Sequence, residues 1–202
     1  VRPAPPPPPG GGGARRGGGG ARPPPPRPPV LLADEPTSAL DPDTTASVLD
    51  VLDRARAELG VTVLVVTHDM AVVRRICSAV AVLDRGRIVE HGSVLDLVTR
   101  PDSRIAAALL PRVDQVPLPR DDRLVADVVL TGEAASGALL SRSAARLGVE
   151  LTLLGGGFAD LAGVPVARWR IGLAGAGAGE VLDALVHAGV PVEPVRAAGV
   201  AA

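Results

Sequence analysis

Two adjacent carboxylates, Asp34 and Glu35, follow the apolar run at 30–33 and precede a turn at Pro36. The run predicts a short buried strand that delivers both side chains to the carboxyl edge of a sheet, where ligands bind in open α/β folds. Two neighbouring carboxylates repel each other, so such a pair commonly handles a cation or a proton. An Asp there can hold Mg²⁺ and a Glu can polarise an attacking water. The structural alternative is a strand that simply ends at Asp in a turn.

The residues after this turn predict a helix and a second strand. Asp41 and Pro42 suit the N-cap and the first helical position, and Gly60 is a typical helix terminator. The β-branched run at 61–66 is typical of strands buried in parallel sheets. Strand, helix and strand therefore form a βαβ unit.

A histidine comes directly after the second strand, in the sequence Thr67-His68-Asp69. A lone His is more often structural than functional. This one ends a buried strand and opens the helix expected at 71–77, so it should lie at the same sheet edge as the two carboxylates. We therefore favour a functional role for His68.

These residues carry a family resemblance. The segment 34–41, Asp-Glu-Pro-Thr-Ser-Ala-Leu-Asp, closely resembles the Walker B motif and D-loop of ABC-transporter ATPases. Thr-His-Asp at 67–69 resembles their switch histidine. A hairpin expected around 84–86, followed by a short helix at 94–98, resembles the end of their ATPase core.

The resemblance implies the following roles. Asp34 would ligate Mg²⁺ beside ATP, Glu35 would be the catalytic base, and His68 would contact the γ-phosphate. Ser38 and Asp41 belong to the D-loop, which would bind near the nucleotide and contact the second ATPase subunit of a homodimer. A permease in the membrane would be the other partner, placing the chain in the cytoplasm at the inner face of the cell membrane.

The C-terminal part predicts a different unit. Strands and helices alternate as βαββαβ, the ferredoxin-like plan; strands are expected at 124–130, 149–154, 164–173 and 190–195, with helices at 134–147 and 181–188. Segments 139–142, 147–149 and 163–165 resemble the ACT-like NIL domain of methionine-importer ATPases, which senses intracellular methionine. Thr152 stands where that family commonly has an amide, and would be the contact to an amino-acid ligand.

The expected fold class is thus α/β, a partial P-loop-type parallel sheet with helices followed by a ferredoxin-like (ACT-like) domain. The expected organisation begins with a disordered tract at 1–29 and the C-terminal portion of an ATPase domain at 30–100. A linker at 101–122, a NIL-type regulatory domain at 123–196 and a tail at 197–202 follow.

All 21 basic residues are Arg, so none of the 202 residues can serve as a P-loop lysine. No Leu-Ser-Gly-Gly-Gln signature is present either. Where the signature should lie, residues 1–29 hold 12 Pro, 8 Gly and five Arg. We interpret this tract as a solvated tail rather than a nucleic-acid-binding segment, and hypothesise a truncated or frame-shifted reading frame that resumes near Arg27.

Other features exclude further classes. No apolar run approaches the ~20 residues that span a bilayer, and a single cysteine, Cys77, indicates a reducing compartment. The glycine run at 155–157 lacks a following Lys, which favours flexible backbone or a bulge in a strand over a phosphate loop. The glycines at 175–179 suit a loose strand-to-helix connection better than a dinucleotide fingerprint.

Three functions remain open. The first is an ATP-binding subunit of an importer for methionine or a related amino acid, whose ATPase is inactive in this polypeptide alone. The second is a stand-alone amino-acid-sensing module on a truncated, ATPase-inactive chain. The third is a non-transport ABC ATPase, against which the regulatory tail argues.

Overall fold

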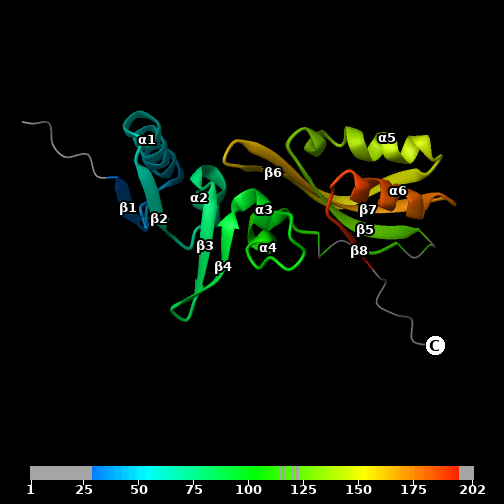
Figure 1. Ribbon diagram of the computed structural model, residues 1–202, viewed down its shortest axis with the longest axis horizontal. Coiled ribbons are helices and arrows are strands. Elements are labelled where there is room, and N and C mark those ends of the chain that lie inside the picture. Colours follow the sequence, from blue (N-terminus) through cyan, green and yellow to red (C-terminus); the bar gives the residue numbers. More distant parts are fainter. Residues whose placement is uncertain (1–28, 114, 116, 120, 122, 196–202) are drawn as a thin grey trace, which may run out of the picture.

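The computed structural model describes residues 29–113, 115, 117–119, 121 and 123–195. The tract expected at 1–29, apart from Pro29, and the tail expected at 197–202 lie outside the described residues. Three sheets are present in the described part: a parallel pair, an antiparallel hairpin and a four-stranded antiparallel sheet. This mixed architecture confirms the expected α/β class (Figure 1).

The first sheet is the expected βαβ unit. Strand β1 (Val30–Asp34) pairs in parallel with β2 (Thr62–Val66), and α1 (Pro42–Leu59) connects them. The side chain of Asp41 caps α1 by accepting from the backbone N–H of Thr44 at 3.0 Å. Gly60 ends the helix in the left-handed conformation, at φ 65°.

One face of this parallel sheet is open among the described residues. Residues alternate between half-buried and exposed along both strands, and the register places paired residues side by side on one face. The exposed apolar side chains are Val30, Leu32, Leu64 and Val66. All-parallel sheets normally have both faces covered, whereas this two-stranded sheet leaves one face exposed among the described residues.

Small elements follow the first sheet: α2 (Met70–Ile76), the hairpin strands β3 (Ala79–Asp84) and β4 (Arg87–Ser93), α3 (Val94–Val98) and α4 (Ala106–Leu109). The hairpin and the helix at 94–98 are as expected. Helix α4 lies inside the segment expected to be a linker, and its Leu109 is buried. Glu90 of β4 holds the start of this helix by accepting from the backbone N–H of Ile105 at 3.2 Å.

The C-terminal sheet has the strand order β6-β7-β5-β8, with every pair antiparallel. Its elements run βαββαβ, and the order matches the ferredoxin-like plan: β5 (Leu124–Thr131), the 3₁₀ helix η1 (Gly132–Ser136), α5 (Ala138–Arg146), β6 (Glu150–Leu161), β7 (Val164–Ala174), α6 (Ala178–His187) and β8 (Val192–Pro194). Helices α5 and α6 cover one face (Figure 1). Ala126, Val128, Ile171, Val181 and Leu185 form the centre of the core beneath them.

Strand β6 is longer than the strand expected at 149–154, because it continues through the three glycines. The pairing with β7 shifts between Leu153 and Gly155, which confirms the expected bulge. At Gly156 the φ angle is 125°, and a Cβ there would overlap the backbone oxygen of Arg168. A glycine is therefore required at this position.

A second hydrophobic cluster joins the two halves of the chain. Leu161 and Val166, at the β6–β7 turn, pack with Val73 of α2 and with buried residues of α3 and α4. The backbone N–H of Ala162 in this turn donates to the carbonyl of Arg74 at 2.7 Å. Figure 1 shows the β6 end of the sheet reaching toward α2. Helices α2, α3 and α4 and the C-terminal sheet are thus connected through one packed region.

Candidate functional site

The first carboxylate, Asp34, ends β1 on the open face of the parallel sheet. It is exposed, and within the described residues no hydrogen bond reaches its carboxylate. The next residue, Glu35, has a φ of 44°, and its backbone N–H donates to the carbonyl of Val66 at 2.8 Å. The strand therefore ends at Asp34, and the backbone turns at Glu35.

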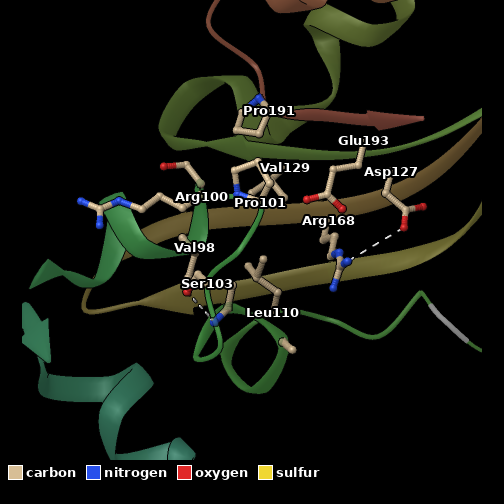
Figure 2. Close-up of a pocket in the computed structure, with 13 residues that line it drawn as sticks. Val98, Arg100, Pro101, Ser103, Leu110, Asp127, Val129, Arg168, Pro191 and Glu193 are labelled. Atoms are coloured by element: carbon tan, nitrogen blue, oxygen red, sulfur yellow. Dashed lines mark hydrogen bonds and ion pairs between the residues drawn. The ribbon is translucent and has the colours of Figure 1, made fainter. Parts of the chain in front are cut away.

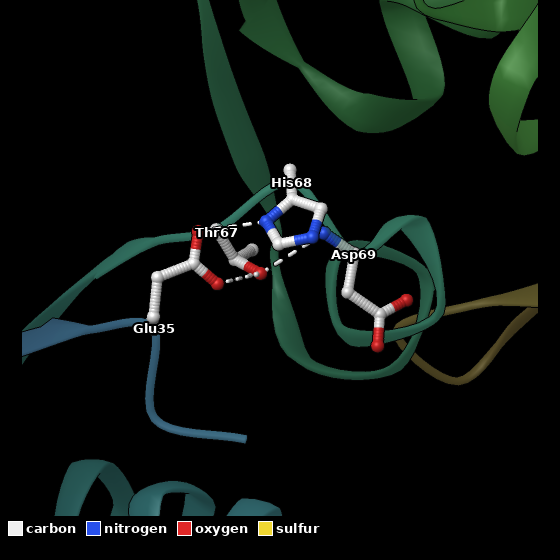
Figure 3. Close-up of polar contacts among 4 residues, drawn as sticks. All are labelled: Glu35, Thr67, His68 and Asp69. Atoms are coloured by element: carbon white, nitrogen blue, oxygen red, sulfur yellow. Dashed lines mark hydrogen bonds and ion pairs between the residues drawn. The ribbon is translucent and has the colours of Figure 1, made fainter. Parts of the chain in front are cut away.

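The second carboxylate contacts the histidine expected at the same edge. Oε1 of Glu35 lies 2.8 Å from Nδ1 of His68. Oε2 of Glu35 accepts a long hydrogen bond from the Thr67 hydroxyl at 3.4 Å. Figure 3 shows these side chains turned toward one another from the ends of β1 and β2. The parallel strands therefore bring Glu35 and His68 together, while Asp34 stays apart from them.

This pair changes the basicity of the imidazole. The hydrogen bond and the negative charge of Glu35 raise the pKa of His68 above its ordinary value. The His68 side chain is 88% exposed and that of Glu35 is 37% exposed. Water and salt screen a pair this open, so its contribution to folding is small. Both groups remain accessible to a ligand.

Thr67 was not identified as a site residue from the sequence. Its hydroxyl accepts from the backbone N–H of Asp69 at 3.0 Å while it contacts Glu35. Asp69 in turn caps α2 by accepting from the N–H of Ala71 at 2.8 Å. The signal available was a Thr two residues before a helix N-cap, a pattern that favours a local hydroxyl-to-backbone turn.

The two D-loop residues are both exposed. The backbone N–H of Ser38 donates to the carbonyl of Glu35 at 3.1 Å, which closes a tight turn after the strand. Asp41 accepts a 2.6 Å hydrogen bond from the Thr44 hydroxyl, and this bond lowers the pKa of the Asp41 carboxyl. Asp41 therefore serves at least as the cap of α1.

Within the described residues no group of three or more His, Cys, Asp or Glu side chains could hold a metal ion. In nucleotide sites Mg²⁺ commonly keeps its waters and binds one or two carboxylates together with substrate phosphates. The exposed, unpartnered oxygens of Asp34 fit such a role. Its assignment as a metal ligand stays a prediction.

Thr152, the expected ligand contact, lies half-buried in β6. Its hydroxyl accepts from Nη1 of Arg123 at 2.8 Å, and Nε of the same guanidinium donates to Asp121 at 2.8 Å. The hydroxyl oxygen of Thr152 thus already accepts a hydrogen bond from the guanidinium of Arg123. A ligand would have to share or replace this hydrogen bond.

A set of buried charges was missed from the sequence. Asp127 of β5 accepts from Arg170 of β7, at 2.7 Å from Nε and 2.8 Å from Nη2. Arg168, two residues earlier on β7, approaches the same carboxylate only to 3.9 Å. The available signal was two Arg at i and i+2 in an apolar strand, which places both on one face of the sheet.

Comparison with known proteins adds to this geometry. Residues 124–194 match the family model described as the NIL domain, so the βαββαβ unit is a NIL domain. This match lies C-terminal to the Walker B-like and switch-like segments, in the order that the sequence predicted.

Three of the similar proteins are named Methionine import ATP-binding protein MetN. The protein of Streptomyces coelicolor is 44% identical over 146 residues, 72% of this chain and 41% of its own length. That of Thermobifida fusca is 41% identical over 166 residues, 82% of this chain and 50% of its own. That of Xanthomonas campestris is 37% identical over 174 residues, 83% of this chain and 52% of its own. The chain spans about half the length of these relatives.

Proposed function

We propose that this chain works as the C-terminal portion of the ATP-binding subunit of an ABC importer for methionine or a related amino acid. The observation that carries this proposal is the Glu35–His68 contact of 2.8 Å, made at the ends of adjacent parallel strands in a chain that also has a NIL domain. Ligands bind at this edge of open α/β sheets. The NIL domain would report the level of the imported amino acid.

The chemistry follows from the positions of three side chains. Glu35, held by the backbone of Val66, accepts a proton from the water that attacks the terminal phosphate of ATP. His68 orients Glu35 and, when protonated, offers a positive charge to the phosphate. Asp34 would hold Mg²⁺ through water, and the ion when bound neutralises phosphate charge.

The partners follow from the same part of the chain. The exposed turn from Ser38 to Asp41 would contact a second ATPase subunit in a homodimer. A membrane permease would bind the dimer at the cytoplasmic face of the cell membrane. Among the helices of residues 29–195, none combines the length and apolar character that a bilayer crossing requires.

A chimera tests this proposal, because the 202 residues include no lysine for a phosphate loop. Residues 30–195 would follow the N-terminal half of the Streptomyces coelicolor relative, co-expressed with that organism's permease. We expect ATP hydrolysis and methionine uptake, and a loss of more than about 100-fold in hydrolysis for Glu35→Gln. Glu58→Gln, an exposed position on α1, is the matched control. Equal hydrolysis by the two variants would contradict the proposal.

A stand-alone amino-acid sensor is the second candidate. The sheet β6-β7-β5-β8 with α5 and α6 encloses its own hydrophobic core, which favours a unit that works without the ATPase part. Its ligand would contact Thr152. Calorimetry of the chain with methionine tests this: binding should weaken in Thr152→Ala and persist in Ser141→Ala, an exposed hydroxyl on α5. No heat at millimolar methionine would count against sensing.

A further inference from the structure

A cavity of about 90 Å³ lies between the α3–α4 segment and the face of the C-terminal sheet opposite α5 and α6. One water needs only about 10–15 Å³ of such a cavity, so there is room for a small organic molecule. Val98 and Leu110 line it from the first half of the chain. Val129 and Arg168 line it from the sheet. Figure 2 shows these side chains around a common space.

The guanidinium of Arg168 has weak partners among the described residues. Its Nη2 is 3.9 Å from Oδ2 of Asp127, and that oxygen already accepts from Arg170 at 2.8 Å. Its Nε is buried and has no hydrogen-bond partner. A buried donor without a partner destabilises the fold, because the group has lost its hydrogen bonds to water. A ligand anion that draws the guanidinium into a paired position would remove this cost.

The lining defines the chemistry of that anion. A planar guanidinium pairs with a carboxylate or a phosphate through two parallel hydrogen bonds. Val98, Leu110 and Val129 present an apolar wall suited to a short aliphatic chain. The carboxylates of Asp127 and Glu193 also line the cavity, and they would repel a doubly charged phosphate more than a single negative charge.

We propose that this cavity binds a short aliphatic carboxylate, whose carboxylate group pairs with Arg168 and whose chain contacts Val98 and Val129. The site does not include Glu35, His68 or Thr152. Its walls come from both halves of the chain, so an occupant would stabilise the contact between the α3–α4 segment and the NIL domain.

Propionate is a suitable probe for an NMR titration of the full chain. The side-chain Nε–H resonance of Arg168 should shift saturably with sodium propionate and should not shift with sodium chloride at equal ionic strength. Nuclear Overhauser effects should connect the propionate methyl to Val129. A shift that only follows ionic strength, or a tighter saturable shift with phosphate, would overturn the proposal.

Two variants complete the test. Followed on the Val129 methyl resonances, Arg168→Gln should weaken propionate binding at least tenfold, because it removes the paired charge. Arg142→Gln, on the exposed side of α5, should leave it unchanged. Equal affinities in the two variants would also overturn the proposal. If Arg168→Gln fails to fold, the titration of the unchanged chain decides alone.

Discussion

Replacing Leu161 with Ala would remove a side chain that is 1% exposed from the cluster joining the β6–β7 turn to α2, α3 and α4. Truncating a buried Leu costs about 2–5 kcal/mol, through lost transfer free energy and the cavity left behind. Because small domains have a total stability of about 5–15 kcal/mol, the change is a large fraction of the whole.

Urea unfolding measures this cost. Trp169, the single tryptophan, lies on β7 beside β6 and reports the C-terminal sheet by fluorescence. Far-UV circular dichroism reports the helices of both halves. Leu153→Ala is the matched control, since Leu153 lies on the same strand and is 51% exposed. The reasoning would be refuted if the two variants lost the same stability.

Three further predictions concern single positions. Glu35→Gln should lower the pKa of His68 toward its ordinary value of 6.5, as an NMR titration of the imidazole would show. Because the pKa of His68 is raised in the folded protein, the pair stabilises folding fully below pH 6.5. This contribution is lost as the pH rises through the pKa of the folded protein. An unchanged pKa would contradict the contact. Gly156→Ala should destabilise the β6–β7 pair, whereas Gly179→Ala in α6, with open space around it, should stabilise by about 0.5–1 kcal/mol in thermal unfolding; the opposite order would contradict the structure. Asp127→Asn should cost about 3–5 kcal/mol in urea, because it removes the carboxylate that pairs with the buried guanidinium of Arg170, and a loss below about 1 kcal/mol would refute this.

Local signals made the first half of the fold predictable. Asp41 and Gly60 fix the ends of α1 through capping, which depends only on neighbouring residues. A helix between two apolar strands favours their parallel pairing in one sheet, and the strands at 30–34 and 62–66 do pair in this way. Because parallel strands end at one edge, the approach of His68 to Glu35 followed from the sequence as well.

Contacts between distant segments were not predictable in the same way. The segment 101–122 has the prolines of a linker, yet Leu109 is buried, because the β6–β7 turn supplies apolar partners that no local pattern reveals. The extension of β6 through its glycines has a similar cause. Gly156 is held by pairing with Trp169 on β7, and intrinsic strand propensity gives no sign of it.

We propose that Glu35 and His68 form part of an ATP site, for which these 202 residues supply no phosphate-binding lysine. Binding of a fluorescent ATP analogue with Mg²⁺ tests it most directly, comparing the 202-residue polypeptide with the chimera described above. We expect binding by the chimera, retained in its Glu35→Gln variant, and none by the polypeptide alone. Micromolar binding by the polypeptide alone would contradict it.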